Sequence, residues 1–271
     1  MRSEFVYTSE DPKIGEPPSF SWEHFATPKL RRLPQSSFTF VEYVGHGAEG
    51  IVVKVKADGY PEPIVFKIRE CINGALLELI TTSFKRAKAE GKPISLNLKP
   101  KTRSKAFQNL ETFSVNDDGS SRVPDEEMKG LQLFETSDAD DAAIMAINSC
   151  LGWTELDTSD VVRDLKRLQC SKLPELPEPK VFCIAYRFVP EGELDMRTVV
   201  AQANFFHVAG FYQRQFKGNN WRGRGVLVDF SDLVPLHETL WSPQGYSCFE
   251  GWVQDAKESH ERWINGTLEY A

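Results

Sequence analysis

The clearest hydrophobic pattern in the sequence lies between residues 37 and 68. Apolar and polar residues alternate over 38–43 and again over 51–55, on either side of a glycine-rich turn. A third apolar run begins at Ile64, after a turn that contains two prolines. Alternation with a period of two is typical of half-buried strands, so this region predicts a three-stranded meander.

The rest of the chain predicts mostly helices. Residues 71–87 place apolar side chains near helical spacing and predict a helix. Further helices are expected at 141–153, at 159–169 with a cap at Ser159 or Asp160, at 195–209 with Gly210 at the end, and at 248–266. Apolar runs at 180–189 and 225–231 predict buried strands. The order of these elements favours the α+β class.

Charge is distributed unevenly along the chain. Eight basic residues against one acid lie between Lys85 and Lys105, and acids dominate from Asp117 to Asp141. The simplest interpretation of residues 88–137 is a poorly ordered, solvated insertion, and the alternative is an arm that binds a protein partner. The basic block leaves nucleic-acid binding as a minor third alternative. The net charge of −7 argues against it.

Composition sets broad limits on the function classes. The 271 residues include 41% apolar and 26% charged residues, which is ordinary for a globular protein. No apolar run approaches the ~20 residues of a membrane span, and the N-terminal residues do not predict a secretory signal. Five cysteines lie far apart and form no C-x-x-C pair, which favours a reducing compartment, cytoplasmic or nuclear.

The glycine-rich turn has the spacing G-x-G-x-x-G-x-V, with Gly45, Gly47 and Gly50 in the glycine positions. This spacing occurs in Rossmann units, where it opens a helix, and in protein kinases, where it joins two strands over the nucleotide phosphates. Because a strand pattern continues from Ile51, the sequence favours the kinase arrangement.

Lys67 ends the apolar run of the third predicted strand. Protein kinases carry at this place the lysine that pairs with nucleotide phosphates and with a helix glutamate. The predicted helix supplies Glu78 as the glutamate, and Glu70 is the second choice. The bland alternative, a merely exposed lysine at a strand end, stays open.

Residues 213–220, QRQFKGNN, have the frame of the kinase catalytic loop H-R-D-x-x-x-x-N. Gln215 stands in place of the catalytic Asp, and Lys217 stands where many kinases contact the transferred phosphoryl group. Asn220 and Asp229 would be the metal ligands, with Asp229 opening an Asp-Phe-Ser tripeptide in place of Asp-Phe-Gly.

These motifs together resemble a fungal kinase-like family related to the FTA-type subunits of the kinetochore Sim complex, over roughly residues 38–240. The resemblance implies a protein-kinase-like fold of two lobes. Residues 1–35 would be an N-terminal arm. Residues 36–189 would be a β-rich N-terminal lobe with the charged insertion at about 88–137. Residues 190–271 would be an abbreviated helical C-terminal lobe.

Two functional interpretations follow from the resemblance and its departures. Gln215 cannot accept a proton at neutral pH, and residues after Asp229 include no A-P-E motif. These departures favour a pseudokinase that serves as an interaction module of a fungal complex, with a protein partner bound through the charged insertion. The alternative is an atypical transferase acting on a small molecule in fungal secondary metabolism. It would use ATP and Mg²⁺, or another activated donor, at Lys67, Asn220 and Asp229.

Overall fold

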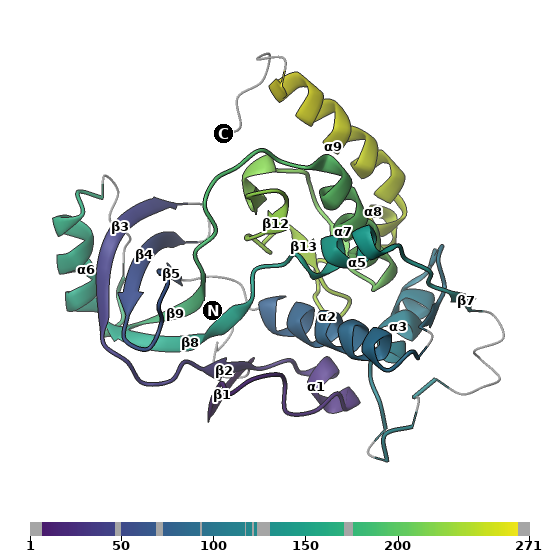
Figure 1. The fold of residues 1–271 in the computed structure, drawn as a ribbon, viewed down its shortest axis with the longest axis horizontal. Helices are drawn as coiled ribbons and strands as arrows, with labels where there is room; N and C mark the ends of the chain where they lie inside the picture. The colour runs from purple at the N-terminus through teal and green to yellow at the C-terminus, as the bar shows by residue number, and fades with distance from the viewer. Residues whose placement is uncertain are drawn as a thin grey trace. The chain divides into compact units, whose positions relative to one another are not determined.

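The computed structural model describes residues 7–46, 50–68, 73–92, 94–116, 118–120, 122–123, 131–170 and 176–264. The chain divides into two compact units (Figure 1). Unit 1 comprises Met1–Glu16, Lys29–Ala75 and Asn148–Phe188, and unit 2 comprises Pro17–Pro28, Leu76–Ile147 and Val189–Ala271. The secondary structure is mixed, as the α+β expectation requires.

Unit 1 is built on one mixed sheet of seven strands among the described residues, in the order β1-β2-β8-β9-β5-β4-β3. The strands are β1 (Thr8–Pro12), β2 (Leu30–Arg32), β3 (Phe38–His46), β4 (Ile51–Ala57), β5 (Ile64–Ile68), β8 (Cys150–Asp157) and β9 (Lys180–Arg187). Pairing is antiparallel from β8 through β9, β5 and β4 to β3, and parallel at β1-β2 and β2-β8. The predicted meander and the buried strand at 180–189 are therefore confirmed.

One face of this sheet carries the core of unit 1. Helix α6 (Thr158–Arg167) lies against it (Figure 1) and contributes the buried Val161 and Leu165. Side chains of alternate strand residues, such as Val53 and Phe66, form the other side of this core. The N-cap of α6 is Asp157, so the expected cap at Ser159 or Asp160 is wrong.

The single helix expected at 141–153 is wrong. Helix α5 (Asp138–Met145) ends early, and β8 begins at Cys150. The reason is a close approach of two backbones at Gly152. Its φ is +137°, and a Cβ there would lie 2.7 Å from the Arg31 carbonyl oxygen in β2. A short apolar run is ambiguous between helix and strand, and here tertiary pairing decides.

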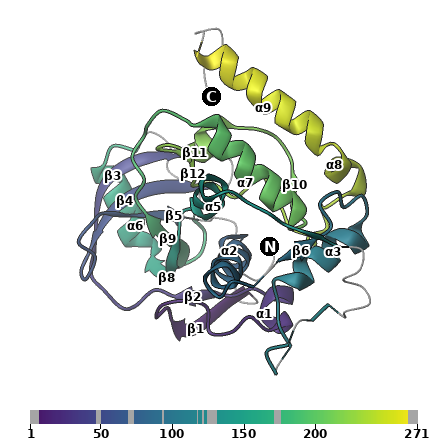
Figure 2. The same cartoon turned by 45° about the vertical axis from the view of Figure 1, so that its right-hand side comes forward.

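Unit 2 is mainly helical (Figure 2). Its helices are α1 (Trp22–Ala26), most of α2 (Asn73–Ala89), α3 (Arg103–Thr112), α5, α7 (Met196–Val208), α8 (Pro243–Ser247) and α9 (Phe249–Ile264). Short antiparallel pairs join β6 (Ser95–Leu96) to β7 (Gln132–Leu133), β10 (Tyr212–Gln213) to β13 (Leu233–Val234), and β11 (Trp221–Arg222) to β12 (Val226–Leu227). The expected helices at 71–87, 195–209 and 248–266 are confirmed as α2, α7 and α9, whereas the strand expected at 225–231 is only the two-residue β12.

An aromatic core holds unit 2 together. Phe205 of α7 contacts Phe84 of α2 at a ring-centroid distance of 5.3 Å and Phe113, which follows α3, at 5.8 Å. All three rings are at most 1% exposed. Offset and edge-to-face contacts of this kind add to the stabilisation from burial of apolar area.

The expected poorly ordered loop at 88–137 is wrong for residues 94–116. Thr102 caps α3 by accepting a hydrogen bond from the Lys105 backbone. Asn109 is fully buried and donates to the Asn97 and Val208 carbonyl oxygens. Charge density concealed these buried residues because only one face of α3 is polar. Within the described residues, no helix is both long and apolar enough to span a membrane.

Candidate functional site

The glycine-rich turn of unit 1 joins two strands, as expected. Gly45 pairs with Val52, and His46 pairs with Ile51, at the open end of the β3–β4 hairpin. Gly50 lies just before β4, while Gly47 lies outside the described residues. Because the second strand continues directly, the alternative of a Rossmann-type turn that opens a helix is excluded.

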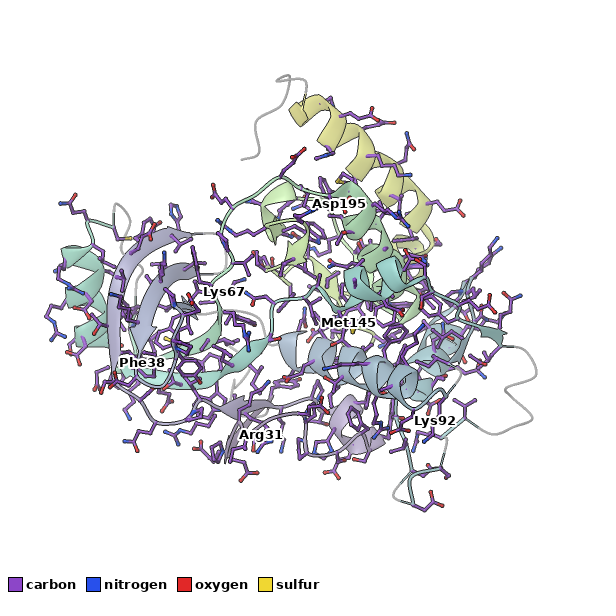
Figure 3. All side chains as sticks on the ribbon, viewed as in Figure 1. Arg31, Phe38, Lys67, Lys92, Met145 and Asp195 are labelled. Carbon is purple, nitrogen blue, oxygen red and sulfur yellow. The ribbon has the colours of Figure 1, made fainter. Side chains whose placement is uncertain are left out.

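Lys67 lies on the strand next to this hairpin. It pairs with Val52 of β4 and with Ile184 of β9 (Lys67 is labelled in Figure 3). Phe66 points into the α6-side core, so Lys67 lies on the opposite face of the sheet. The residue is only 6% exposed, and its Nζ lies 5.7 Å from the centroid of the Tyr186 ring. The alternative of a merely exposed strand-end lysine is therefore wrong.

The burial of Lys67 has an energetic meaning. An ammonium group loses hydration when it is buried, and an aromatic face compensates for only part of that loss. A buried cation one strand away from a glycine-rich hairpin is suited to receive an anionic group. Unit 1 thus brings together Gly45, Gly50 and Lys67 of the predicted nucleotide site.

The catalytic-loop-like segment lies in unit 2, between β10 and β11. The backbone N–H of Arg214 donates to the Asp232 carbonyl oxygen at 3.0 Å, which continues the β10–β13 pairing. A 3₁₀ turn at Gly218–Asn220 follows. The backbone N–H groups of Val228 and Asp229 both donate to the Asn220 carbonyl oxygen, at 2.8 and 3.2 Å. The structure therefore brings the two predicted metal ligands together.

Asp232 links two of the predicted site residues. Its Oδ2 accepts a hydrogen bond from Asn220 Nδ2 at 3.0 Å and an ion pair from Lys217 Nζ at 2.9 Å. Asp232 is 6% exposed and Asn220 is 4% exposed, whereas the Lys217 side chain is 42% exposed. A buried carboxylate needs such charge-assisted partners, because an unpaired charge in the interior is costly.

Sequence reasoning missed Asp232. The available signal was a second acid three residues after Asp229, in the run DFSD. This signal is weak because an Asp in a loop is most often solvated. Only the register of β10 against β13 brings Asp232 to the catalytic-loop-like segment.

The metal-binding capacity of this region is limited. The described residues contain no group of three or more His, Cys, Asp or Glu side chains that could hold a metal ion. Mg²⁺ in nucleotide sites is commonly held by one or two protein groups together with phosphate oxygens. Asn220 and Asp229 therefore fit Mg²⁺ only where phosphate oxygens complete its coordination shell.

Gln215 is exposed and lines a pocket of about 630 Å³ in unit 2. Close by, His207 at the end of α7 is stacked between Tyr246 and Phe249, with both ring-centroid distances at 4.2 Å. Burial lowers the pKa of His207 to about 4, and burial raises the pKa of Tyr246. His207 is therefore neutral at physiological pH.

Two predicted pairings stay predictions. Glu78 is half-buried on α2 in unit 2, and Lys67 belongs to unit 1, so neither the Lys67–Glu78 pair nor the approach of Lys67 to Asp229 is tested within one unit. Glu70, the second choice, lies outside the described residues.

Comparison with known proteins yields no relative: no protein-family model matches the sequence, and no curated protein matches it significantly. The fungal kinase-like resemblance therefore stays a prediction. The functional argument rests on the geometry of the two units.

Proposed function

We propose that this protein is a pseudokinase, a kinase-fold protein that serves as an interaction module and does not transfer phosphoryl groups. The observation that carries the proposal is the Asp232 carboxylate, which binds both Lys217 and Asn220. These are the two residues that a kinase would use toward the phosphoryl group and the metal.

The missing base is the first physical reason. Gln215 occupies the position of the residue that accepts the proton of the acceptor hydroxyl. A carboxamide donates and accepts hydrogen bonds but takes up no proton at neutral pH. General-base catalysis typically contributes 10²–10⁴-fold to a rate, so its loss alone slows transfer without forbidding it.

The position of Lys217 is the second reason. Transfer requires cations that neutralise the charge developing on the phosphoryl oxygens. The Lys217 ammonium is already neutralised by Asp232 at 2.9 Å. If Lys217 turned toward a phosphate, the largely buried Asp232 carboxylate would lose its cation, which is strongly destabilising.

An interaction role needs a surface for a partner. Lys99, Lys101 and Lys105 lie exposed just before and at the start of α3. Their ammonium groups form no ion pair with other residues that the structure describes. An acidic surface on a partner protein would complement these charges.

One observation favours the alternative of an atypical transferase using ATP and Mg²⁺. Lys67 is buried beside the glycine-rich hairpin, and Asn220 is joined to Asp229. Since positioning and electrostatics supply most of the rate in phosphoryl transfer, these groups would suffice for slow chemistry.

Turnover of Mg·ATP separates the two functions. Purified protein is incubated with Mg·ATP, and ADP formation is measured for the wild type and for Asp229→Asn, which removes the metal-binding charge while keeping the side-chain shape. We expect the two proteins to be indistinguishable. ADP formation that depends on Asp229 would contradict the pseudokinase proposal and support the transferase.

A further inference from the structure

The pocket that Gln215 lines carries a separate inference. It has a volume of about 630 Å³, within the range of small-molecule sites. Its walls are the segment 212–216 on one side and residues of α8 and α9 on the other. All of these residues belong to unit 2, so the pocket does not depend on the proposed function or on any nucleotide site.

The charged side chains at this pocket are mainly basic. Arg214 comes from the loop after β10 and Arg262 from α9, while Asp255 is the acid among the described lining residues. The Arg214 side chain is exposed, and it has no hydrogen bond or ion pair within the described part of the chain. Its planar guanidinium group is suited to bind a carboxylate or phosphate with two parallel hydrogen bonds.

A buried hydrogen-bond donor gives a second, independent indication. Trp252 lines the pocket and is 8% exposed, and its indole Nε1 finds no acceptor among the residues described. Buried polar groups in native proteins nearly always have a partner, and an unsatisfied one costs about 1–3 kcal/mol. A ligand oxygen in the pocket would supply that acceptor.

The remaining walls define the body of the ligand. Phe216 packs edge-on against Trp252 at a centroid distance of 6.0 Å, and Phe249 stacks on it at 6.1 Å, which fixes the indole ring. Aromatic lining with a few convergent donors is typical of sites for ring-containing acids.

From these observations we propose that the pocket between residues 212–216 and α8–α9 binds a small aromatic acid. Arg214 and Arg262 would hold its carboxylate or phosphate, and the Trp252 indole N–H would donate to one of its oxygens. The open position at Gly251 would lie beside its ring.

The test uses the ¹H–¹⁵N resonance of the Trp252 indole in the full-length protein, assigned by its loss in Trp252→Phe. Benzoate and phenyl phosphate are titrated to millimolar concentration, with neutral benzamide as the matched control. We expect a saturable downfield shift with at least one anion and none with benzamide. A preference for benzoate or for phenyl phosphate distinguishes a carboxylate site from a phosphate site. No shift with either anion, or an equal shift with benzamide, would overturn the proposal.

Variants locate the site. Arg214→Gln and Arg262→Gln should each weaken binding by about tenfold or more, because each removes a charge-assisted contact. Arg222→Gln is the control, because Arg222 pairs with Glu191 and does not line the pocket. Equal weakening by Arg222→Gln would mean non-specific attraction and would overturn the assignment.

Gly251→Met closes the pocket without a folding penalty. No atom lies within 4 Å of a Cβ built at Gly251, and replacing a helical glycine stabilises a helix by about 0.5–1 kcal/mol. The variant should therefore melt at or above the wild-type temperature and lose binding. A variant that keeps wild-type affinity would show that the probes bind elsewhere.

Discussion

The two halves of the predicted kinase-like site differ in what they keep. In unit 1, the glycine hairpin joins two strands, and Lys67 lies buried on the strand beside it, paired with Val52. In unit 2, the position of the base is Gln215, and the carboxylate that binds Lys217 comes from Asp232, on the far side of the β10–β13 pair.

This difference separates binding from chemistry. The half that would hold phosphates has the local geometry expected for that task, and the half that would transfer them has its cation and amide bound to an internal carboxylate. A carboxylate near Lys217 is thus present, but it comes from a different strand and serves as a buried structural partner. Each prediction below tests one of the two halves.

The largest expected effect is in unit 1, at the sheet that positions Lys67. Gly152→Ala should lower the free energy of unfolding by about 3 kcal/mol or more, because φ is +137° and the new Cβ would meet the Arg31 carbonyl oxygen at 2.7 Å. Urea denaturation measures the change. Gly119→Ala, at a φ of +80° with open space around it, is the control and should cost clearly less. Equal costs would show that β2 does not approach β8 closely.

The next effect is in unit 2. Asp232→Ala should destabilise the protein by about 2–4 kcal/mol, since it leaves the buried Asn220 amide without its acceptor and removes the partner of Lys217. Asp232→Asn keeps the shape and one acceptor oxygen, so a smaller loss is expected. Chemical denaturation of both variants checks the order. If Asp232→Ala were neutral, the carboxylate would not hold this segment together.

Acid should destabilise unit 2 through His207. Its pKa is about 4 in the folded protein and about 6.5 when unfolded, so the unfolded chain binds more protons between these values. Stability is therefore complete above about pH 6.5 and falls as the pH is lowered toward 4, by at most about 3 kcal/mol.

The control for this pH effect is His207→Phe. Phenylalanine keeps the stack between Tyr246 and Phe249 and cannot titrate. Melting temperatures of wild type and variant from pH 7 to about pH 4.5 give the difference that belongs to His207. Parallel pH profiles would show that His207 is protonated equally in both states.

The smallest effect is expected at Lys67. Lys67→Met removes a buried charge and keeps an unbranched side chain, so the free energy of unfolding should change by less than about 1 kcal/mol. The same variant should abolish any binding of ATP, measured by calorimetry, whereas the exposed Lys56→Met should not. A large destabilisation would mean that Lys67 is a structural ion-pair partner rather than a site for an anion.

The sequence predicted unit 1 better than unit 2 for a physical reason. The strands β3, β4 and β5 alternate polar and apolar residues and are joined by short turns, so local pattern and tertiary pairing agree. Where they disagree, as at Gly152, the close contact with β2 decides, and no local pattern reports it.

The site in unit 2 was predicted in part. The spacing of Gln215, Lys217, Asn220 and Asp229 identified the segment, but Asp232 joins it only through the register of two-residue strands. Likewise, the dense charge at 88–105 concealed the start of α3, whose buried Asn109 and Leu110 hold it in unit 2. Contacts between residues far apart in sequence carry this information.

The most direct test of the account is the ¹⁵Nζ resonance of Lys217, assigned by its loss in Lys217→Arg. The account predicts a resonance that shifts in Asp232→Asn and stays unchanged when Mg·ATP is added to the wild type, because Asp232 keeps the ammonium group. A resonance that moves with Mg·ATP, or one that ignores Asp232→Asn, would show that Lys217 is available to a phosphoryl group and would contradict the pseudokinase proposal.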